Sequence, residues 1–186
     1  MIERMIRAVK LDAAFYREVR DDPSLDQEAL TVVILVAAVN AGLGFLVSAF
    51  VSLAFGGFGS FLGTIINAVL GFIATVVLFF IGAYAIWYIG TNFFNGTGTP
   101  EGVRRALAYA YTPNIIGAIP CIGIIGAIWS LVAFFIATRE SMEMDNTNTA
   151  LTIVAYVVIV IIVSLVLGAV GIGAGLGLGA LSGLGR

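Results

Sequence analysis

The charged residues of this chain are confined to a few short segments. Residues 29–100, 106–138 and 146–185 contain no Lys, Arg, Asp or Glu, and only 11% of the whole chain is charged. A soluble domain carries roughly 25% charged residues, because its surface must stay hydrated throughout. Uncharged apolar stretches longer than about 20 residues are typical of membrane-spanning helices. The sequence therefore predicts an all-α polytopic integral membrane protein, with about five transmembrane helices preceded by an amphipathic interfacial helix.

The composition also excludes several classes of function. The chain has no His and one Cys, Cys121. Zinc sites, iron–sulfur sites and Cys/His or Ser/His catalytic pairs therefore lack ligands or a base. The net charge of −2, without a long basic run, argues against nucleic-acid binding. We expect no enzyme activity, no catalytic residue, no metal and no cofactor, and no cleavable signal peptide, because the first 20 residues are too charged.

Residues 1–28 form the predicted cytoplasmic N-terminal segment. Within residues 1–20, apolar side chains recur three and four positions apart, which places them on one face of a helix. Such a helix can lie in the headgroup layer with this apolar stripe facing the lipid. The alternative is a short cytoplasmic helix that packs on the spans. Ser24 and Gln27 fit a capping box at the start of the next helix.

Residues 29–178 form the predicted membrane domain. The first two spans cover about residues 29–55 and 61–88, with a turn at 56–60. Thr99, Pro100 and Glu101 are typical of a helix start, and the third helix begins there. The apolar stretch 106–138 is interrupted at Pro120, so it forms either two full spans or a re-entrant hairpin; we favour two spans. The last span begins near Thr149 and is followed by a glycine-rich tail, residues 179–186.

The basic residues indicate the orientation in the membrane. With five spans, every Lys and Arg except Arg186 falls on one side. By the positive-inside rule that side is cytoplasmic. The sequence therefore predicts a multi-pass protein of the cell membrane, with the N-terminus cytoplasmic and the C-terminus outside.

Two groups of residues are candidates for a functional role. Charged residues beside the third and fourth helices are candidate contacts for a partner or a lipid headgroup, or else anchors that pair with one another: Arg104, Arg105, Arg139 and Glu140. Other residues are candidates for a helix kink or for helix packing: Tyr109, Pro113, Asn114, Pro120, Gly171 and Gly175. Isolated polar residues inside the spans, such as Asn40, Ser52 and Thr64, are expected to hydrogen-bond to neighbouring helices.

The third and fourth helices carry a family resemblance. Residues 105–113 read Arg-Ala-Leu-Ala-Tyr-Ala-Tyr-Thr-Pro, and they are followed by the Pro120 break, Ile128-Trp129 and Arg139-Glu140. This pattern resembles the Yip-one domain family, small five-span membrane proteins named for interaction with Ypt/Rab GTPases. The resemblance covers about residues 29–165 and implies a five-helix membrane domain with a cytoplasmic N-terminus. In eukaryotic members it implies non-catalytic work in membrane traffic through protein partners.

This chain differs from the eukaryotic members at its N-terminal end. Its segment before the first span is only about 28 residues long, and it lacks their Asp-Leu-Tyr-Gly-Pro-like stretch. It is more similar to the short prokaryotic members, so we do not expect Rab binding. The sequence favours a membrane-organising scaffold that engages membrane lipids or other membrane or cytoplasmic proteins, with a homo-oligomer as one option. The alternative is a small-solute or lipid transporter or channel with a path near the Pro113 kink.

Overall fold

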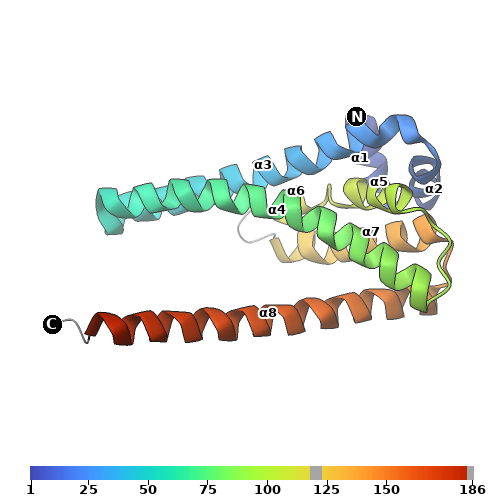
Figure 1. Ribbon diagram of the computed structural model, residues 1–186. Coiled ribbons are helices and arrows are strands. Elements are labelled where there is room, and N and C mark those ends of the chain that lie inside the picture. Colours follow the sequence, from blue (N-terminus) through green and yellow to red (C-terminus); the bar gives the residue numbers. More distant parts are fainter. Residues whose placement is uncertain (118–122, 184–186) are drawn as a thin grey trace.

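The computed structural model describes residues 1–117 and 123–183, and every regular element in them is helical (Figure 1). The elements are α1 (Ile2–Val9), α2 (Ala13–Asp21), the 3-10 turn η1 (Pro23–Leu25), α3 (Asp26–Val51), the π-helical segment η2 (Ser52–Gly56), α4 (Gly57–Phe93), α5 (Pro100–Ala110), α6 (Asn114–Gly117), α7 (Gly123–Met142) and α8 (Asn146–Gly183). The prediction of an all-α chain is confirmed for this part of the sequence.

Four helices within the described ranges are long and apolar enough to cross a membrane. They cover Pro23–Phe55, Phe61–Phe93, Ile124–Met142 and Asn146–Val166. Most of their surface is not buried inside the protein; only 6% of the apolar window in Phe61–Phe93 is. A helix that is apolar on all sides and exposed requires a lipid environment. The prediction of a polytopic membrane protein is therefore confirmed, whereas five spans are not.

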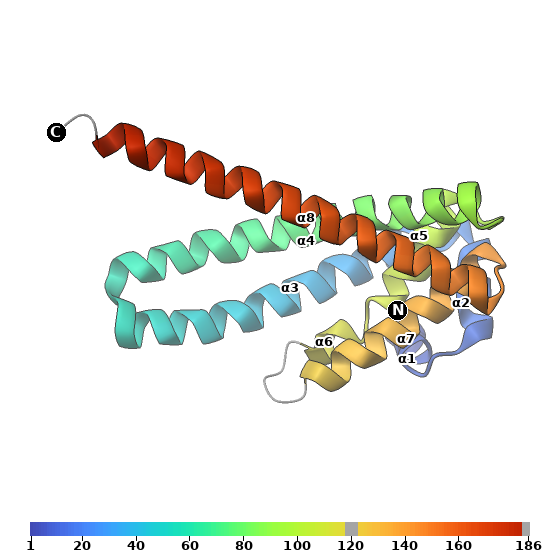
Figure 2. The same ribbon diagram turned by 90° about the horizontal axis from the view of Figure 1, so that it is seen from below.

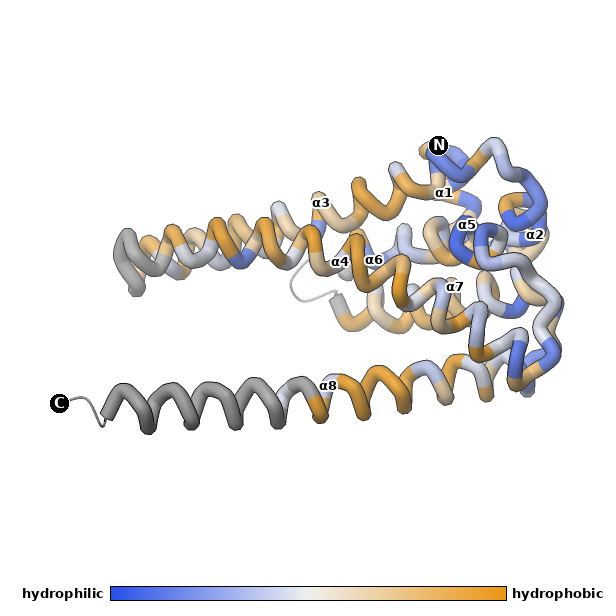
Figure 3. Tube along the Cα trace, viewed as in Figure 1, coloured by the Kyte–Doolittle hydropathy of each residue, from blue (hydrophilic) through white to orange (hydrophobic). Residues whose placement is uncertain are grey.

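The helices are arranged around a polar end and an apolar end. Helices α3 and α4 form a long antiparallel hairpin, and α8 runs beside the bundle and diverges from it (Figures 1 and 2). Helices α1, α2 and α5 gather at the end where α3 begins and α4 finishes. Hydrophilic residues concentrate at this end, and the long helices leading away from it are apolar (Figure 3). We call α1, α2, residues 10–12 between them, η1, α5 and the loops 94–99 and 143–145 the polar end.

The N-terminal segment differs from its prediction in two ways. It forms two helices rather than one, because Leu11 adopts a left-handed backbone conformation (φ 60°) and Asp12 then caps α2 by accepting from the Phe15 N–H at 3.2 Å. The capping box of Ser24 and Gln27 is wrong. Asp22 instead accepts from both the backbone N–H and the hydroxyl of Ser24, which produces the turn η1.

The apolar stripe of α1 and α2 mostly packs against protein rather than lipid. Met5, Ala8, Phe15, Tyr16 and Val19 are buried in one core with residues of α5 and α7. The structure thus realises the alternative in which the segment packs on the spans. The outer face of α1 remains apolar at two positions of the described helix, since Ile2 and Ile6 are exposed.

The third predicted span is divided. Thr99 and Pro100 do start a helix, as predicted, with the Thr99 hydroxyl accepting from the Gly102 N–H. This helix, α5, ends after 11 residues, and α6 has only four. Pro113 lies between them and has no N–H for a helical hydrogen bond. The prediction of one continuous third span is therefore wrong for residues 100–117, while Pro120 lies outside the described residues.

The α3–α4 connection also differs from its prediction. The sequence predicted a turn at residues 56–60, but α4 already begins at Gly57 and follows directly on the π-helical segment Ser52–Gly56. Gly171 and Gly175 fall inside α8, and their surroundings lie outside the described side chains.

Loop 94–99 is closely packed against the end of α7. The Trp87 indole N–H donates to the Gly98 carbonyl at 2.8 Å, and the Thr97 N–H donates to the Met142 carbonyl at 2.9 Å. A Cβ atom at Gly98 would overlap the backbone carbonyl of Ser141. Only glycine therefore fits this close approach of two backbones.

We expect Gly98→Ala to lower the free energy of unfolding by about 2 kcal/mol, because backbone atoms must separate to admit the methyl group. Thermal unfolding in detergent micelles measures the effect. Gly42→Ala is the control, since nothing lies within 4 Å of its added Cβ and alanine favours a helix. Equal stability of the two variants would contradict the packing described for the loop.

Candidate functional site: the polar end and the helix break

Arg105 is the buried charge of the polar end. Only 5% of its side chain is exposed. Its Nε donates to the Val19 carbonyl at 3.0 Å, Nη2 donates to the Arg20 carbonyl, and Nη1 meets Asp26 Oδ1 at 3.1 Å. The last carbonyls of a helix have no partner within it, so Arg105 satisfies two of them at the end of α2. The guanidinium thereby joins α2, α5 and the start of α3.

Arg104 lies beside Arg105 but reaches the surface. Its Nη2 meets Asp26 Oδ1 at 3.0 Å, and its guanidinium lies 5.9 Å from the centre of the Phe80 ring. The side chain is 36% exposed. Of the two arginines, Arg104 is therefore the one whose remaining N–H groups can reach an external group.

Glu28 collects donors at the start of α3. It accepts from the Tyr109 hydroxyl at 2.7 Å and from Arg4 Nη1 at 2.6 Å. Tyr109 is fully buried, and its ring packs edge-on against Phe15 at 5.2 Å. Burial, together with the hydrogen bond to Glu28, raises the pKa of Tyr109 above its ordinary value. Tyr109 thus acts as a packing residue that links α5 to α2 and α3.

The other predicted pair, Arg139 and Glu140, forms a second ionic cluster. Arg139 Nη2 lies 2.6 Å from Glu140 Oε1, and Arg139 Nη1 donates to Asn146 Oδ1 at 3.0 Å. Arg17 of α2 approaches the other carboxylate oxygen of Glu140 at 3.0 Å. This cluster joins α2 to α7 and α8, and the Arg104–Arg105 group joins α2 to α3 and α5. The structure brings the four predicted charged residues to one end, but in two separate groups.

Arg20 adds a third link. It contacts Asp21 at 2.7 Å and Glu143 at 2.6 Å. The hydrogen bond and charge of Arg20 hold the pKa of the Glu143 carboxyl below its ordinary value, and that of Asp21 likewise. Both carboxylates are mostly exposed, so solvent weakens these ion pairs.

The sequence analysis missed the acidic partners of the arginines. Asp26 and Glu28 stand in the sequence only as the end of a charged segment. Asp26 and Glu28 stand at the start of the first span, and Arg104 and Arg105 stand at the start of the third helix. This shared position could have indicated that they pair. Complementary charges at the same end of antiparallel or neighbouring helices favour pairing.

The break between α5 and α6 borders a cavity of about 620 Å³. Its wall is formed by α4, the end of α5, Tyr111 in the break, Asn114 at the start of α6, α7 and α8. The hydroxyl of Thr112, also in the break, is buried without a hydrogen-bond partner, but Thr112 is not part of the cavity wall. Pro113 is buried beside them. The kink predicted at Pro113 is therefore present as a break in the helix.

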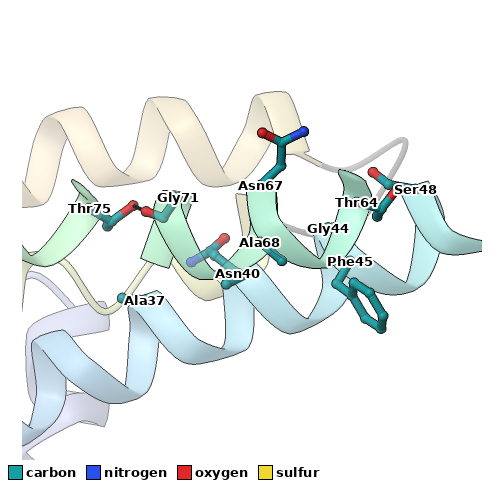
Figure 4. Close-up of a pocket in the computed structure, with 11 residues that line it drawn as sticks. Ala37, Asn40, Gly44, Phe45, Ser48, Thr64, Asn67, Ala68, Gly71 and Thr75 are labelled. Carbon is teal, nitrogen blue, oxygen red and sulfur yellow. Dashed lines mark hydrogen bonds between the residues drawn. The ribbon is translucent and has the colours of Figure 1, made fainter. Parts of the chain in front are cut away.

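A second cavity of about 390 Å³ lies between α3 and α4 (Figure 4). Its polar lining residues include Asn40, Thr64 and Asn67. Asn40 donates to the Val36 carbonyl of its own helix at 2.8 Å, and the Thr64 and Ser52 hydroxyls meet across the hairpin at 2.8 Å. The predicted hydrogen bonding between helices is thus present for Ser52 and Thr64. Among the described residues, no group of three metal-binding side chains occurs.

Comparison with known protein families identifies the family of this chain. The model of the Yip1 domain matches residues 11–168, which include α2 through α7 and the first part of α8. The chain belongs to the Yip1 domain family. No curated protein and no solved structure matches it. The resemblance found in the sequence is confirmed, and the Yip1 family is generally one of non-enzymatic membrane proteins.

The Yip1 domain contains both the polar end, apart from α1, and the helix break. Arg104, Arg105, Tyr109 and Pro113 all lie inside the matched range. The membrane-embedded character of the family agrees with the four apolar helices found in the described residues.

We expect Arg105→Ala to lower the free energy of unfolding by about 3 kcal/mol, because two carbonyls at the end of α2 and the Asp26 carboxylate lose the buried guanidinium that donates to them. Arg104→Ala is the matched control. It removes an adjacent, partly exposed guanidinium with one ion pair to the same carboxylate, and should cost less than about 1 kcal/mol. Unfolding in detergent, followed by circular dichroism, compares the two. Similar losses of stability in both variants would contradict the role of Arg105 in joining α2, α5 and the start of α3.

The Arg20 ion pairs predict a dependence of stability on pH. Because the pKa values of Asp21 and Glu143 are lowered by folding, their contribution is present above the unfolded values of about 4 and is lost as the pH falls below them. The melting temperature of wild type should exceed that of Arg20→Gln at pH 7, and this difference should shrink toward pH 3. A difference that stays constant or grows at low pH would contradict the assignment.

Proposed function

We propose that this Yip1 domain protein is a non-catalytic membrane scaffold that engages protein partners or lipids at its cytoplasmic face. The observation that carries the proposal is the folded polar end, in which buried Arg105 of α5 fixes α2 to the start of α3. A rigid surface loses little conformational entropy on binding and therefore suits recognition. Four charged side chains on this surface are exposed and have no ion pair within the described residues: Glu3, Lys10, Glu101 and Asp145.

The basic residues of the polar end also indicate how the protein is oriented in the membrane. The described basic residues all belong to the polar end or to the last turn of α7. By the positive-inside rule, we assign this end to the cytoplasmic side of the cell membrane. The N-terminus is then cytoplasmic and α8 leads to the outside.

We propose that the outer face of α1 touches the headgroup layer. The indole N–H of Trp129 on α7 donates to the Val9 carbonyl at the end of α1, at 2.7 Å. Trp129 is partly exposed on a candidate span, and tryptophan favours the membrane interface. The exposed Ile2 and Ile6 then supply the apolar contact of an interfacial helix.

We propose that residues 106–138 form a re-entrant hairpin rather than two full spans. The uncharged part of α7 before Arg139 covers residues 123–138, about 24 Å at roughly 1.5 Å per residue. The hydrocarbon core is about 30 Å thick. On the other arm, α5 holds buried Arg105 within the polar end and α6 adds four residues. This topology keeps the two termini on opposite sides, as five spans would.

The chain's single cysteine, Cys121, tests this topology. A membrane-impermeant maleimide applied outside intact cells should leave Cys121 unlabelled until detergent is added, because a re-entrant tip does not reach the outer surface. Lys10→Cys and Arg186→Cys, each in a Cys121→Ser background, calibrate labelling from the inside and the outside. Labelling of Cys121 from outside at the rate of Arg186→Cys would establish two full spans instead.

Native mass spectrometry of the protein, gently extracted from its own membrane, tests the scaffold. We expect a stoichiometric protein partner that is lost when the exposed charges are reversed in a Lys10→Glu, Glu101→Lys variant. Arg186→Glu, a charge reversal outside the polar end, should retain it. A protein that carries no partner in wild type, or keeps it in the reversed variant, would contradict this function.

A lipid or solute transporter is the second candidate function. The observation that favours it is the cavity of about 620 Å³ beside Pro113, with Tyr111 and Asn114 in its wall. If the protein is a transporter, Asn114→Ala should reduce the flux of lipid or solute across proteoliposome membranes. If it is a scaffold, the same variant should keep its protein partner.

A further inference from the structure

The cavity at the helix break has aromatic walls. Phe79 of α4 packs on Tyr111 with ring centres 5.8 Å apart, and Phe134 of α7 packs on Tyr156 of α8 with centres 6.5 Å apart. Its volume of about 620 Å³ lies within the range of about 300–1,000 Å³ that holds a small organic ligand. The cavity can therefore accommodate an elongated apolar group between two aromatic pairs.

The mouth of the cavity faces lipid. Leu78 of α4, Leu131 of α7 and Val157 of α8 line it and are 62%, 64% and 44% exposed. All three belong to helices that are apolar enough to cross the membrane. Figures 1 and 2 show α8 diverging from α4 with distance from the polar end. A molecule enters most directly from the hydrocarbon core, sideways between these helices.

Three polar side chains of the cavity wall can donate hydrogen bonds but meet no acceptor among the described residues. Within the described part of the chain, the hydroxyls of Tyr111 and Tyr156 and the amide of Asn114 have no hydrogen-bond partner. The hydroxyls of Thr75 and Ser130, also in the wall, differ because each donates to a carbonyl of its own helix at 2.8 Å. A polar group left unpaired in hydrocarbon costs free energy. The three free donors therefore favour a ligand that brings hydrogen-bond acceptors.

We propose that this cavity binds one acyl chain of a membrane glycerolipid, with an ester carbonyl accepting hydrogen bonds from Tyr111, Asn114 or Tyr156. Among the described residues no charged side chain lines the cavity, so its chemistry fits an uncharged ester rather than a phosphate. Ester groups only accept hydrogen bonds, and phenol and amide N–H groups donate them. The site is independent of the scaffold function and holds for either function proposed above.

The test compares ester-linked with ether-linked lipid. Purified protein in nanodiscs of dioleoyl phosphatidylcholine, or of the ether-linked phosphatidylcholine with matching chains, is released into detergent and weighed by native mass spectrometry. Wild type should retain one ester lipid per chain, and about fivefold less of the ether lipid, the effect of about one net hydrogen bond. Equal retention of both lipids by wild type, or retention of neither, would overturn the proposal.

Two variants separate the carbonyl contact from the chain contact. Tyr111→Phe, Asn114→Leu and Tyr156→Phe combined should equalise retention of ester and ether lipid, because all three donors are gone and the shape is kept. Ala127→Phe, which fills the cavity from α7, should abolish retention of both. The controls are Tyr84→Phe, an exposed hydroxyl outside the cavity, and Ile162→Phe on the exposed surface of α8; both should behave as wild type.

Several outcomes would count against the site. If Ala127→Phe folds and retains lipid normally, the bound lipid lies elsewhere. If the variant of Tyr111, Asn114 and Tyr156 keeps the preference for the ester lipid, the carbonyl assignment is wrong. Thermal unfolding verifies that each variant is folded. The conservative combination of Tyr111→Phe, Asn114→Leu and Tyr156→Phe decides the proposal even if the larger Ala127→Phe change prevents folding.

Discussion

A single buried guanidinium holds the polar end of this protein together. Arg105 is 5% exposed, and burying a charge is costly unless its hydrogen bonds are satisfied. Here two carbonyls at the end of α2 and the carboxylate of Asp26 satisfy it. The planar guanidinium suits this role because its donors point in several fixed directions at once. The contact adds to the ion pairs of Arg17 and Arg20 and to the apolar packing of α1 and α2 in fixing the N-terminal segment.

The break after α5 makes this arrangement compatible with a membrane. If the helix that begins at Pro100 were continuous, its apolar residues after Arg105 would extend into the bilayer. Instead α5 stops at Ala110, so its buried face serves the polar end, and the chain resumes in α6 after Pro113. The same break leaves room between α4, α7 and α8, because a four-residue helix does not fill the space of a full span. The polar end and the lipid-facing cavity therefore share one structural origin.

Local sequence patterns predicted local structure well where no competing partner was nearby. The start of α5 at Thr99 and Pro100 was predicted, because capping depends on residues within one turn. The capping box at Ser24 failed because Asp22, two residues earlier, offers a stronger acceptor to the same N–H. The apolar stripe of residues 1–20 was visible, but periodicity shows only that a face is buried. Whether lipid or protein covers that face depends on segments about 100 residues away, such as α5 and α7.

The sequence by itself determined the class of this protein and its family. Uncharged apolar stretches of more than about 20 residues are long enough to cross a bilayer as helices. The Yip1 domain is recognised from the sequence over residues 11–168. The tertiary structure decided which charges are accessible and which are used internally. Arg104 and Arg105 are neighbours in sequence, yet one reaches the surface and the other is buried, because a helix turns adjacent side chains about 100° apart. Their partners in α2 and α3 are about 80 residues away, a distance over which composition and periodicity carry no information.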